Sequence, residues 1–148
     1  MLDSSAFSEI DGIGEDCVSD ILRLARPMTY SCVYIGNRAS YEIQDSRTPA
    51  HLRRLAANLI YVATSASADT PPEANLRSEI RRHFAGNARS GKHNVDADIL
   101  FDALKYQCDF VVTGDKRFAG KVQTFPNTRI TPLAPRDFAS ALRSGVWL

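Results

Sequence analysis

The most constraining feature of this sequence is a short, wholly apolar run, Phe110–Val112, that is closed by Thr113-Gly-Asp115. A strand with one solvated face alternates apolar and polar residues, whereas a strand buried on both faces is apolar at consecutive positions. The run follows a helical pattern from Asp96 to about Gln107, in which apolar residues recur with the helical period. A helix that leads into a doubly buried strand predicts a parallel sheet covered by helices on both faces.

Further helices and strands are predicted along the rest of the chain. Extended segments are expected at 2–7, 29–35 and 129–133, and helices over about 17–25, 38–44, 52–60 and 135–144. Another helix should follow Thr70-Pro-Pro-Glu73, where the Thr hydroxyl and the Glu carboxylate form a capping box. The chain contains no internal repeat. We therefore expect one domain over residues 1–148, an α/β fold built as a three-layer αβα sandwich around a central parallel sheet.

The composition narrows the class of protein without identifying it. A net charge of +1, with 44% hydrophobic and 24% charged residues, excludes a histone-like tail and an acidic disordered chain. No apolar run approaches the roughly 20 residues of a membrane helix. Six acids and no base precede Arg23, unlike a secretory leader, and three cysteines show no zinc spacing. These features predict a cytoplasmic protein with reduced thiols and no membrane partner.

Acidic residues are expected where the strands of this fold end. The ligand sites of open parallel sheets lie at the carboxyl ends of the strands, so acids placed there should meet at one edge. Carboxylates gathered at one place repel each other unless a divalent cation is bound, and oxygen ligands favour Mg²⁺ or Mn²⁺. The candidate metal-site and catalytic residues are Asp3, Glu42, Asp96 and Asp115.

Two of these acids have ordinary structural alternatives. Asp96 is also suited to capping its helix, because an acid is favoured near a helix N-terminus. An acid such as Glu42 is ordinarily a solvent-exposed residue on a helix surface. Asp98 is a reserve ligand. Asp98 and Asp102 share one helix face, at i and i+4, and we expect that face to be exposed.

Basic and aromatic residues are candidates for contact with nucleic acid. Lys116 and Arg117 directly follow Asp115, and Arg38 and Lys92 lie near other candidate acids in the sequence. All four are candidates for binding RNA phosphates, although surface solubility explains such residues equally well. Tyr34, Tyr41 and Tyr106 are expected to pack rather than to stack on bases, and the three histidines share no metal spacing.

Several of these segments together resemble the PIN-domain family. Met1-Leu-Asp3-Ser-Ser5-Ala-Phe7 is similar to the opening strand of that family, and Ile35–Glu42 fits the position of its second acid. The most specific similarity runs from Asp96 through Thr113-Gly-Asp115 to Phe118. The closing segment Arg129–Phe138 resembles the last strand and helix, so the resemblance spans nearly the whole chain.

This resemblance implies a Mg²⁺- or Mn²⁺-dependent endoribonuclease, of the kind that serves as the toxin of a VapBC-type toxin–antitoxin pair. Asp3, Glu42, Asp96 and Asp115 would be its metal-site acids, with Ser5 and Thr113 supporting them. Ser5 stands where the family commonly has Asn. One inserted residue in Phe110–Val112, relative to the commonest spacing in the family, makes Asp98 an alternative to Asp96. A cognate antitoxin and a homodimer are implied partners.

Two other classes of function are compatible with parts of this pattern. A catalytically degenerate domain that only binds protein or RNA would also carry this pattern, and the Ser5 departure is consistent with it. A phosphatase with an aspartyl nucleophile after its first strand normally has a second Asp two positions later, where this chain has Ser5.

Overall fold

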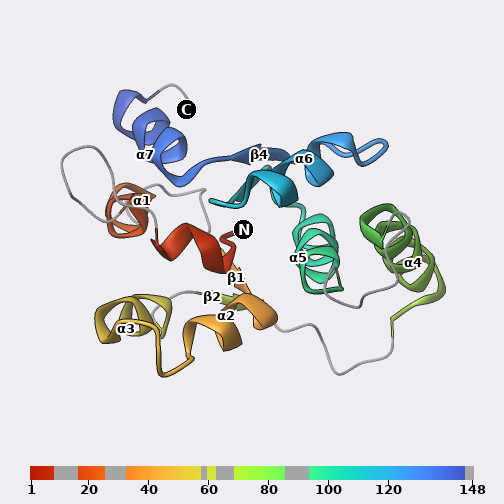
Figure 1. The fold of residues 1–148 in the computed structure, drawn as a ribbon. Helices are drawn as coiled ribbons and strands as arrows, with labels where there is room; N and C mark the ends of the chain where they lie inside the picture. The colour runs from red at the N-terminus through yellow and green to blue at the C-terminus, as the bar shows by residue number, and fades with distance from the viewer. Residues whose placement is uncertain (9–16, 26–32, 58–59, 63–68, 86–93, 146–148) are drawn as a thin grey trace.

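A computed structural model describes residues 1–8, 17–25, 33–57, 60–62, 69–85 and 94–145 (Figure 1). The chain forms a mixed α/β structure with a small parallel sheet. The strands are β1 (Tyr34–Gly36), β2 (Ile60–Val62), β3 (Phe110–Val112) and β4 (Thr131–Leu133). The helices are the 3₁₀ helix η1 (Ser4–Ser8) and α1 (Cys17–Ala25), α2 (Asn37–Ile43), α3 (Ala50–Ala57), α4 (Pro71–Ala85), α5 (Asn94–Lys105), α6 (Lys116–Thr124) and α7 (Pro135–Ser144).

The N-terminal residues join two pairs of parallel strands. β1 pairs with β2, and β3 pairs with β4, in parallel in both cases. Leu2 forms parallel bridges to Ile35 of β1 and to Val112 of β3, so it lies between the two pairs. The backbone N–H of Leu2 donates to Tyr34 at 2.8 Å, and that of Asp3 donates to Val112 at 3.0 Å. The first residues of the chain are therefore central in the sheet, with later strands added on either side.

Successive strand residues contribute to two different hydrophobic clusters. Val111 and Met1 pack with residues of α4, α5 and α6, whereas Val112 and Leu2 pack with residues of α1, α2, α3 and α7. Because side chains alternate across a strand, these two clusters lie on opposite faces. Figure 1 shows α4 beside α5 at one end of the molecule and α1 near α7 at the other. None of the described helices combines the length and apolar character needed to cross a membrane.

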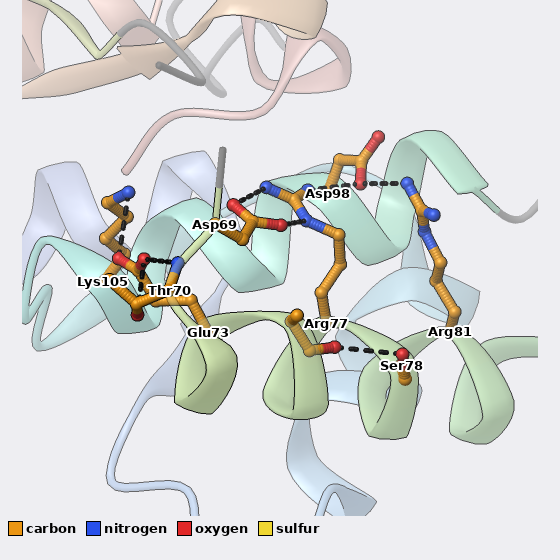
Figure 2. A network of polar contacts seen from close by, with 9 residues as sticks. Asp69, Thr70, Glu73, Arg77, Ser78, Arg81, Asp98 and Lys105 are labelled. Carbon is orange, nitrogen blue, oxygen red and sulfur yellow. Dashed lines mark hydrogen bonds and ion pairs between the residues drawn. The ribbon is translucent and has the colours of Figure 1, made fainter. Parts of the chain in front are cut away.

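The helix pair α4–α5 is held by an ion-pair network (Figure 2). Arg77 of α4 donates to Asp69 at 2.7 Å and to Asp98 of α5 at 2.9 Å, and its guanidinium lies 3.8 Å from the centre of the Phe101 ring. Arg81 adds a second contact to Asp98 at 3.2 Å. These contacts fix α5, which carries two of the candidate acids.

The start of α4 agrees in part with the predicted capping box. Glu73 accepts from the backbone N–H of Thr70 at 2.8 Å, as expected. The Thr70 hydroxyl donates to the same Glu73 oxygen at 2.8 Å instead of accepting from the backbone. Lys105 also pairs with Glu73, at 3.0 Å, and this contact attaches the beginning of α4 to the end of α5.

Several sequence predictions are confirmed. Strands β3 and β4 and helices α5 and α7 lie within two residues of their expected bounds. Gly145 ends α7 in the left-handed conformation, with a φ of 67°. Part of the predicted strand at 29–35 lies outside the described residues.

Two predictions of secondary structure are wrong, and one helix was missed. The segment 2–7 is extended only as far as Asp3 and then turns into η1. The apolar stripe over 52–60 does not mark one helix, because α3 ends at Ala57 and Ile60 belongs to β2. Short apolar runs do not distinguish a helix end from a buried strand. Helix α6 was not predicted, although Asp115, which caps it, is a typical signal for a helix start.

Candidate functional site

The candidate site is centred on the carboxylate of Asp3. This residue follows Leu2, which bridges β1 and β3, and is only 6% exposed. Its Oδ1 accepts from the backbone N–H of Ser4 at 2.7 Å, and its Oδ2 accepts from the hydroxyls of Ser5 at 2.6 Å and Thr113 at 2.7 Å. A buried carboxylate needs such donors because burial removes its hydration. The chain thus holds one acid, with both of its oxygens hydrogen-bonded, at the point where strand order reverses.

Ser5 and Thr113 connect Asp3 to the loop after β3. Their hydroxyl oxygens lie 3.0 Å apart. Ser5 Oγ also accepts from the backbone N–H of Gly114 at 2.9 Å, and Thr113 Oγ1 accepts from that of Asp115 at 3.0 Å. Side chains that donate to Asp3 therefore also set the backbone that carries Asp115. Both residues therefore lie against Asp3, and their supporting role at a metal site stays a prediction.

Ser4 links Asp3 to Glu42. Its Oγ donates to Glu42 Oε2 at 2.5 Å, and Glu42 is exposed on α2. Helix α2 begins immediately after β1, with Gly36 as its N-cap, so the strand end positions the first turn of this helix. The sequence prediction did not include Ser4. The only signal for Ser4 in the sequence is its position, as a small hydroxyl residue directly after Asp3.

Asp115 is exposed and caps α6. Its Oδ1 accepts from the backbone N–H groups of Arg117 at 2.7 Å and Phe118 at 3.1 Å. Phe118 is buried in the cluster beneath the helix, which anchors the first turn. An acid at a helix N-terminus is stabilised by the unsatisfied N–H groups there. The same arrangement keeps this carboxylate beside the loop that Thr113 and Ser5 organise.

The other two predicted ligands lie on α5 and differ in their surroundings. Asp96 is half-buried in the first turn of α5, and the hydrogen bonds above do not connect it to Asp3. Asp98 accepts from Arg77 and Arg81 of α4. Asp98 therefore takes part in the ion-pair network shown in Figure 2.

The donor set fits a hard divalent cation by its chemistry. Carboxylate and hydroxyl oxygens surround the site, and these are the ligands that Mg²⁺ and Mn²⁺ prefer. Within the described residues, no three acidic, His or Cys side chains are grouped closely enough to hold an ion as they stand. Asp3, Glu42 and Asp115 belong to one set of hydrogen-bonded residues, which is joined by Ser4, Ser5 and Thr113.

Asp102 contradicts the sequence prediction. We expected its helix face to be exposed, but Asp102 is 2% exposed, and its Oδ1 has no hydrogen-bond partner in the described part of the chain. A Cβ placed on Gly36 would lie 3.4 Å from its Oδ2, so the carboxyl lies against the end of β1. Burial raises the pKa of Asp102 to about 6, although the charge of Arg77 acts in the opposite direction. The i, i+4 spacing shows that Asp98 and Asp102 share one face of α5. It does not show which element packs against that face, so it does not reveal the burial of Asp102.

The predicted RNA-binding residues are only partly described. Lys116 and Arg117 are exposed in the first turn of α6, beside Asp115. Arg38 lies in α2, and Lys92 lies outside the described residues. Tyr41 was expected to pack but is 68% exposed on α2. Exposed cationic side chains therefore lie on α6, and an exposed aromatic side chain lies on α2, in each case next to an exposed candidate acid.

Comparison with protein families, with curated proteins and with solved structures gives no match for this chain.

Proposed function

We propose that this protein is a Mg²⁺- or Mn²⁺-dependent endoribonuclease that hydrolyses RNA phosphodiester bonds. One observation carries the proposal. Buried Asp3 follows Leu2, which bridges β1 and β3, and a continuous set of hydrogen bonds joins it to Glu42 after β1 and to the backbone of Asp115 after β3. In open parallel sheets, such an edge, where strand order reverses, is the usual ligand site.

The proposed fold is a three-layer PIN-like sandwich. Two observations support it: strands lie on both sides of Leu2, and the hydrophobic clusters divide between alternate residues of β3. The resemblance described above adds a role as a toxin paired with an antitoxin, in a homodimer. We retain these as parts of the proposal.

Asp3, Glu42, Asp96 and Asp115 are the proposed ligands of the ion. When bound, Mg²⁺ or Mn²⁺ supplies Lewis acidity toward a phosphoryl oxygen and lowers the pKa of a coordinated water. Ser5 and Thr113 hold the Asp3 carboxylate in one orientation, and Ser4 orients Glu42. Orienting charged groups before the reaction is a large part of electrostatic catalysis. Lys116 and Arg117 would contact the RNA backbone beside Asp115.

The proposal is tested by RNA cleavage with Mg²⁺ or Mn²⁺, with and without a chelator. We expect the chelator and the substitutions Asp3→Asn and Asp115→Asn each to abolish cleavage. Asp137→Asn is the matched control, because Asp137 is an exposed acid in the first turn of another helix, α7. Cleavage that survives both chelation and Asp115→Asn would refute the proposal.

A second candidate function is a binding module without catalysis. The observation in its favour is that the oxygens of Asp3 already accept hydrogen bonds from Ser4, Ser5 and Thr113, with no group of three ligands assembled in the described residues. Calorimetric titration with Mn²⁺ separates the two functions. Binding that is lost in Asp3→Asn supports the nuclease, whereas RNA binding without Mn²⁺ binding supports the module.

A further inference from the structure

A cavity opens between η1, α2 and α3, and its volume is about 440 Å³. Small-molecule sites commonly occupy about 300–1,000 Å³. The interior of the cavity is apolar, because Phe7, Ile43 and Leu52 line it and are only 3%, 2% and 8% exposed. These side chains offer a surface on which the hydrocarbon part of a small ligand is removed from water.

The charged residues that line the cavity give it a net negative charge. They are Glu42, Asp45 and Arg47. Arg47 donates from its Nε and Nη2 to Asp45 at 2.9 and 3.0 Å, and these hydrogen bonds lower the pKa of Asp45 to about 2. The opposite charges of this pair cancel each other, so the remaining charge of the lining is that of Glu42.

The Glu42 carboxylate is accessible to a cationic ligand. It is exposed at the end of α2, and its Oε2 accepts a hydrogen bond from the neutral hydroxyl of Ser4 at 2.5 Å. In the part of the chain that the structure describes, no Lys, Arg or His side chain pairs with it. The hydroxyl orients the carboxylate without cancelling its charge. An ammonium group is the donor that such a carboxylate binds most strongly, because both partners are then charged.

We propose that this cavity binds an aliphatic amine, with its hydrocarbon chain on Phe7, Ile43 and Leu52 and its ammonium group on Glu42. A neutral ligand with the same chain leaves the carboxylate without a charged partner, and an acidic ligand is repelled by it. Because Glu42 is also a proposed ligand of the divalent ion, the bound amine competes with Mg²⁺ or Mn²⁺. This competition rests on the proposed function, whereas the amine site itself does not.

The test is calorimetric titration of the metal-free protein with n-hexylamine, which is charged at pH 7. n-Hexanol has the same hydrocarbon chain without the charge, and hexanoate has the opposite charge. We expect n-hexylamine to bind about fivefold more tightly than n-hexanol, the scale of one exposed ion pair, and hexanoate to bind less tightly than either. Equal binding of the amine and the alcohol, or no binding of the amine, overturns the proposal.

Two pairs of variants locate the binding. Glu42→Gln should lower the affinity for n-hexylamine to that for n-hexanol, whereas Glu79→Gln, at an exposed acid of α4 outside the lining, should leave it unchanged. Thr48 is half-buried and lines the cavity, so Thr48→Trp should weaken binding of both probes. Gln44→Trp is its control, because Gln44 is exposed and is not part of the lining. Circular dichroism confirms that each variant is folded, and wild-type affinity of folded Glu42→Gln for the amine overturns the proposal.

Titration with Mn²⁺ and an RNA cleavage assay distinguish this proposal from the nuclease. If n-hexylamine binds and weakens the binding of Mn²⁺, the amine site and the competition are both supported. If n-hexylamine binds through Glu42 but Mn²⁺ does not bind and RNA is not cut, the nuclease proposal fails and the amine site stands. If RNA is cut with Mn²⁺ but n-hexylamine does not bind, the amine site alone fails.

Discussion

The hydroxyl of Thr113 donates a buried 2.7 Å hydrogen bond to Oδ2 of Asp3, 110 positions earlier in the chain. The bond joins the residue after Leu2 to the residue after β3, and the same Thr113 oxygen accepts from the backbone N–H of Asp115. One side chain therefore links the Asp3 carboxylate to the backbone of Asp115.

We predict that Thr113→Val destabilises the protein. The substitution keeps the side-chain shape but removes a donor to a buried carboxylate, a loss of about 1–3 kcal/mol. Urea unfolding followed by circular dichroism measures it. Thr131→Val, at an exposed position of neighbouring β4, is the control and should change stability little. A similar loss in both variants would show that the bond to Asp3 has no special role.

Two substitutions of Asp115 should separate its capping role from its charge. Asn keeps an oxygen that accepts from Arg117 and Phe118, so we expect Asp115→Asn to change the unfolding free energy by less than about 0.5 kcal/mol. Asp115→Ala should lose about 1 kcal/mol, because the cap is absent. Both should lose metal-dependent RNA cleavage. Full activity of the folded Asn variant would limit Asp115 to a structural role.

Arg77→Met is expected to loosen α4 from α5. The side chains of Arg77 and Asp98 are 13% and 14% exposed, and removal of this arginine leaves two carboxylates without their main partner. We expect a loss of about 2–4 kcal/mol by urea unfolding, as for other shielded pairs. Arg81→Met is the control, because its side chain is 47% exposed and such pairs contribute about 0–1 kcal/mol. Equal effects would contradict this explanation of the network.

The buried carboxyl of Asp102 should make stability depend on pH. Its pKa is raised by burial from 3.8 to about 6. Between these values the folded chain binds more protons there than the unfolded chain, so this group lowers stability as pH rises from about 4 to about 6. Asp102→Asn removes that contribution.

We therefore expect the change in the free energy of unfolding caused by Asp102→Asn, relative to wild type, to be more favourable at pH 7 than at pH 4 by about 1–3 kcal/mol. Chemical unfolding at the two pH values measures the difference, and any constant effect of the amide cancels. Asp109→Asn, at an exposed position after the same helix, should show no such difference. The same pH dependence in wild type and Asp102→Asn would show that the carboxyl is not desolvated.

The local sequence pattern was sufficient to predict the helices and strands whose signals lie within a few residues. We predicted β3, α5 and α7 correctly, because the sequence signal for each of them depends on neighbouring residues. The mixed α/β class and the parallel pairing of strands followed from them. The placement of Asp3 and Asp115 at strand ends followed from the same reasoning.

The sequence by itself determined which residues could supply oxygen ligands and at which strand ends they stand. Only the tertiary structure decided that Ser4 bridges to Glu42, that Asp98 pairs with Arg77, and that Asp102 is buried against Gly36. The physical reason is that periodicity specifies the direction in which a side chain leaves its own helix or strand, whereas exposure and charge pairing depend on the element packed opposite. That element is supplied by a distant part of the chain.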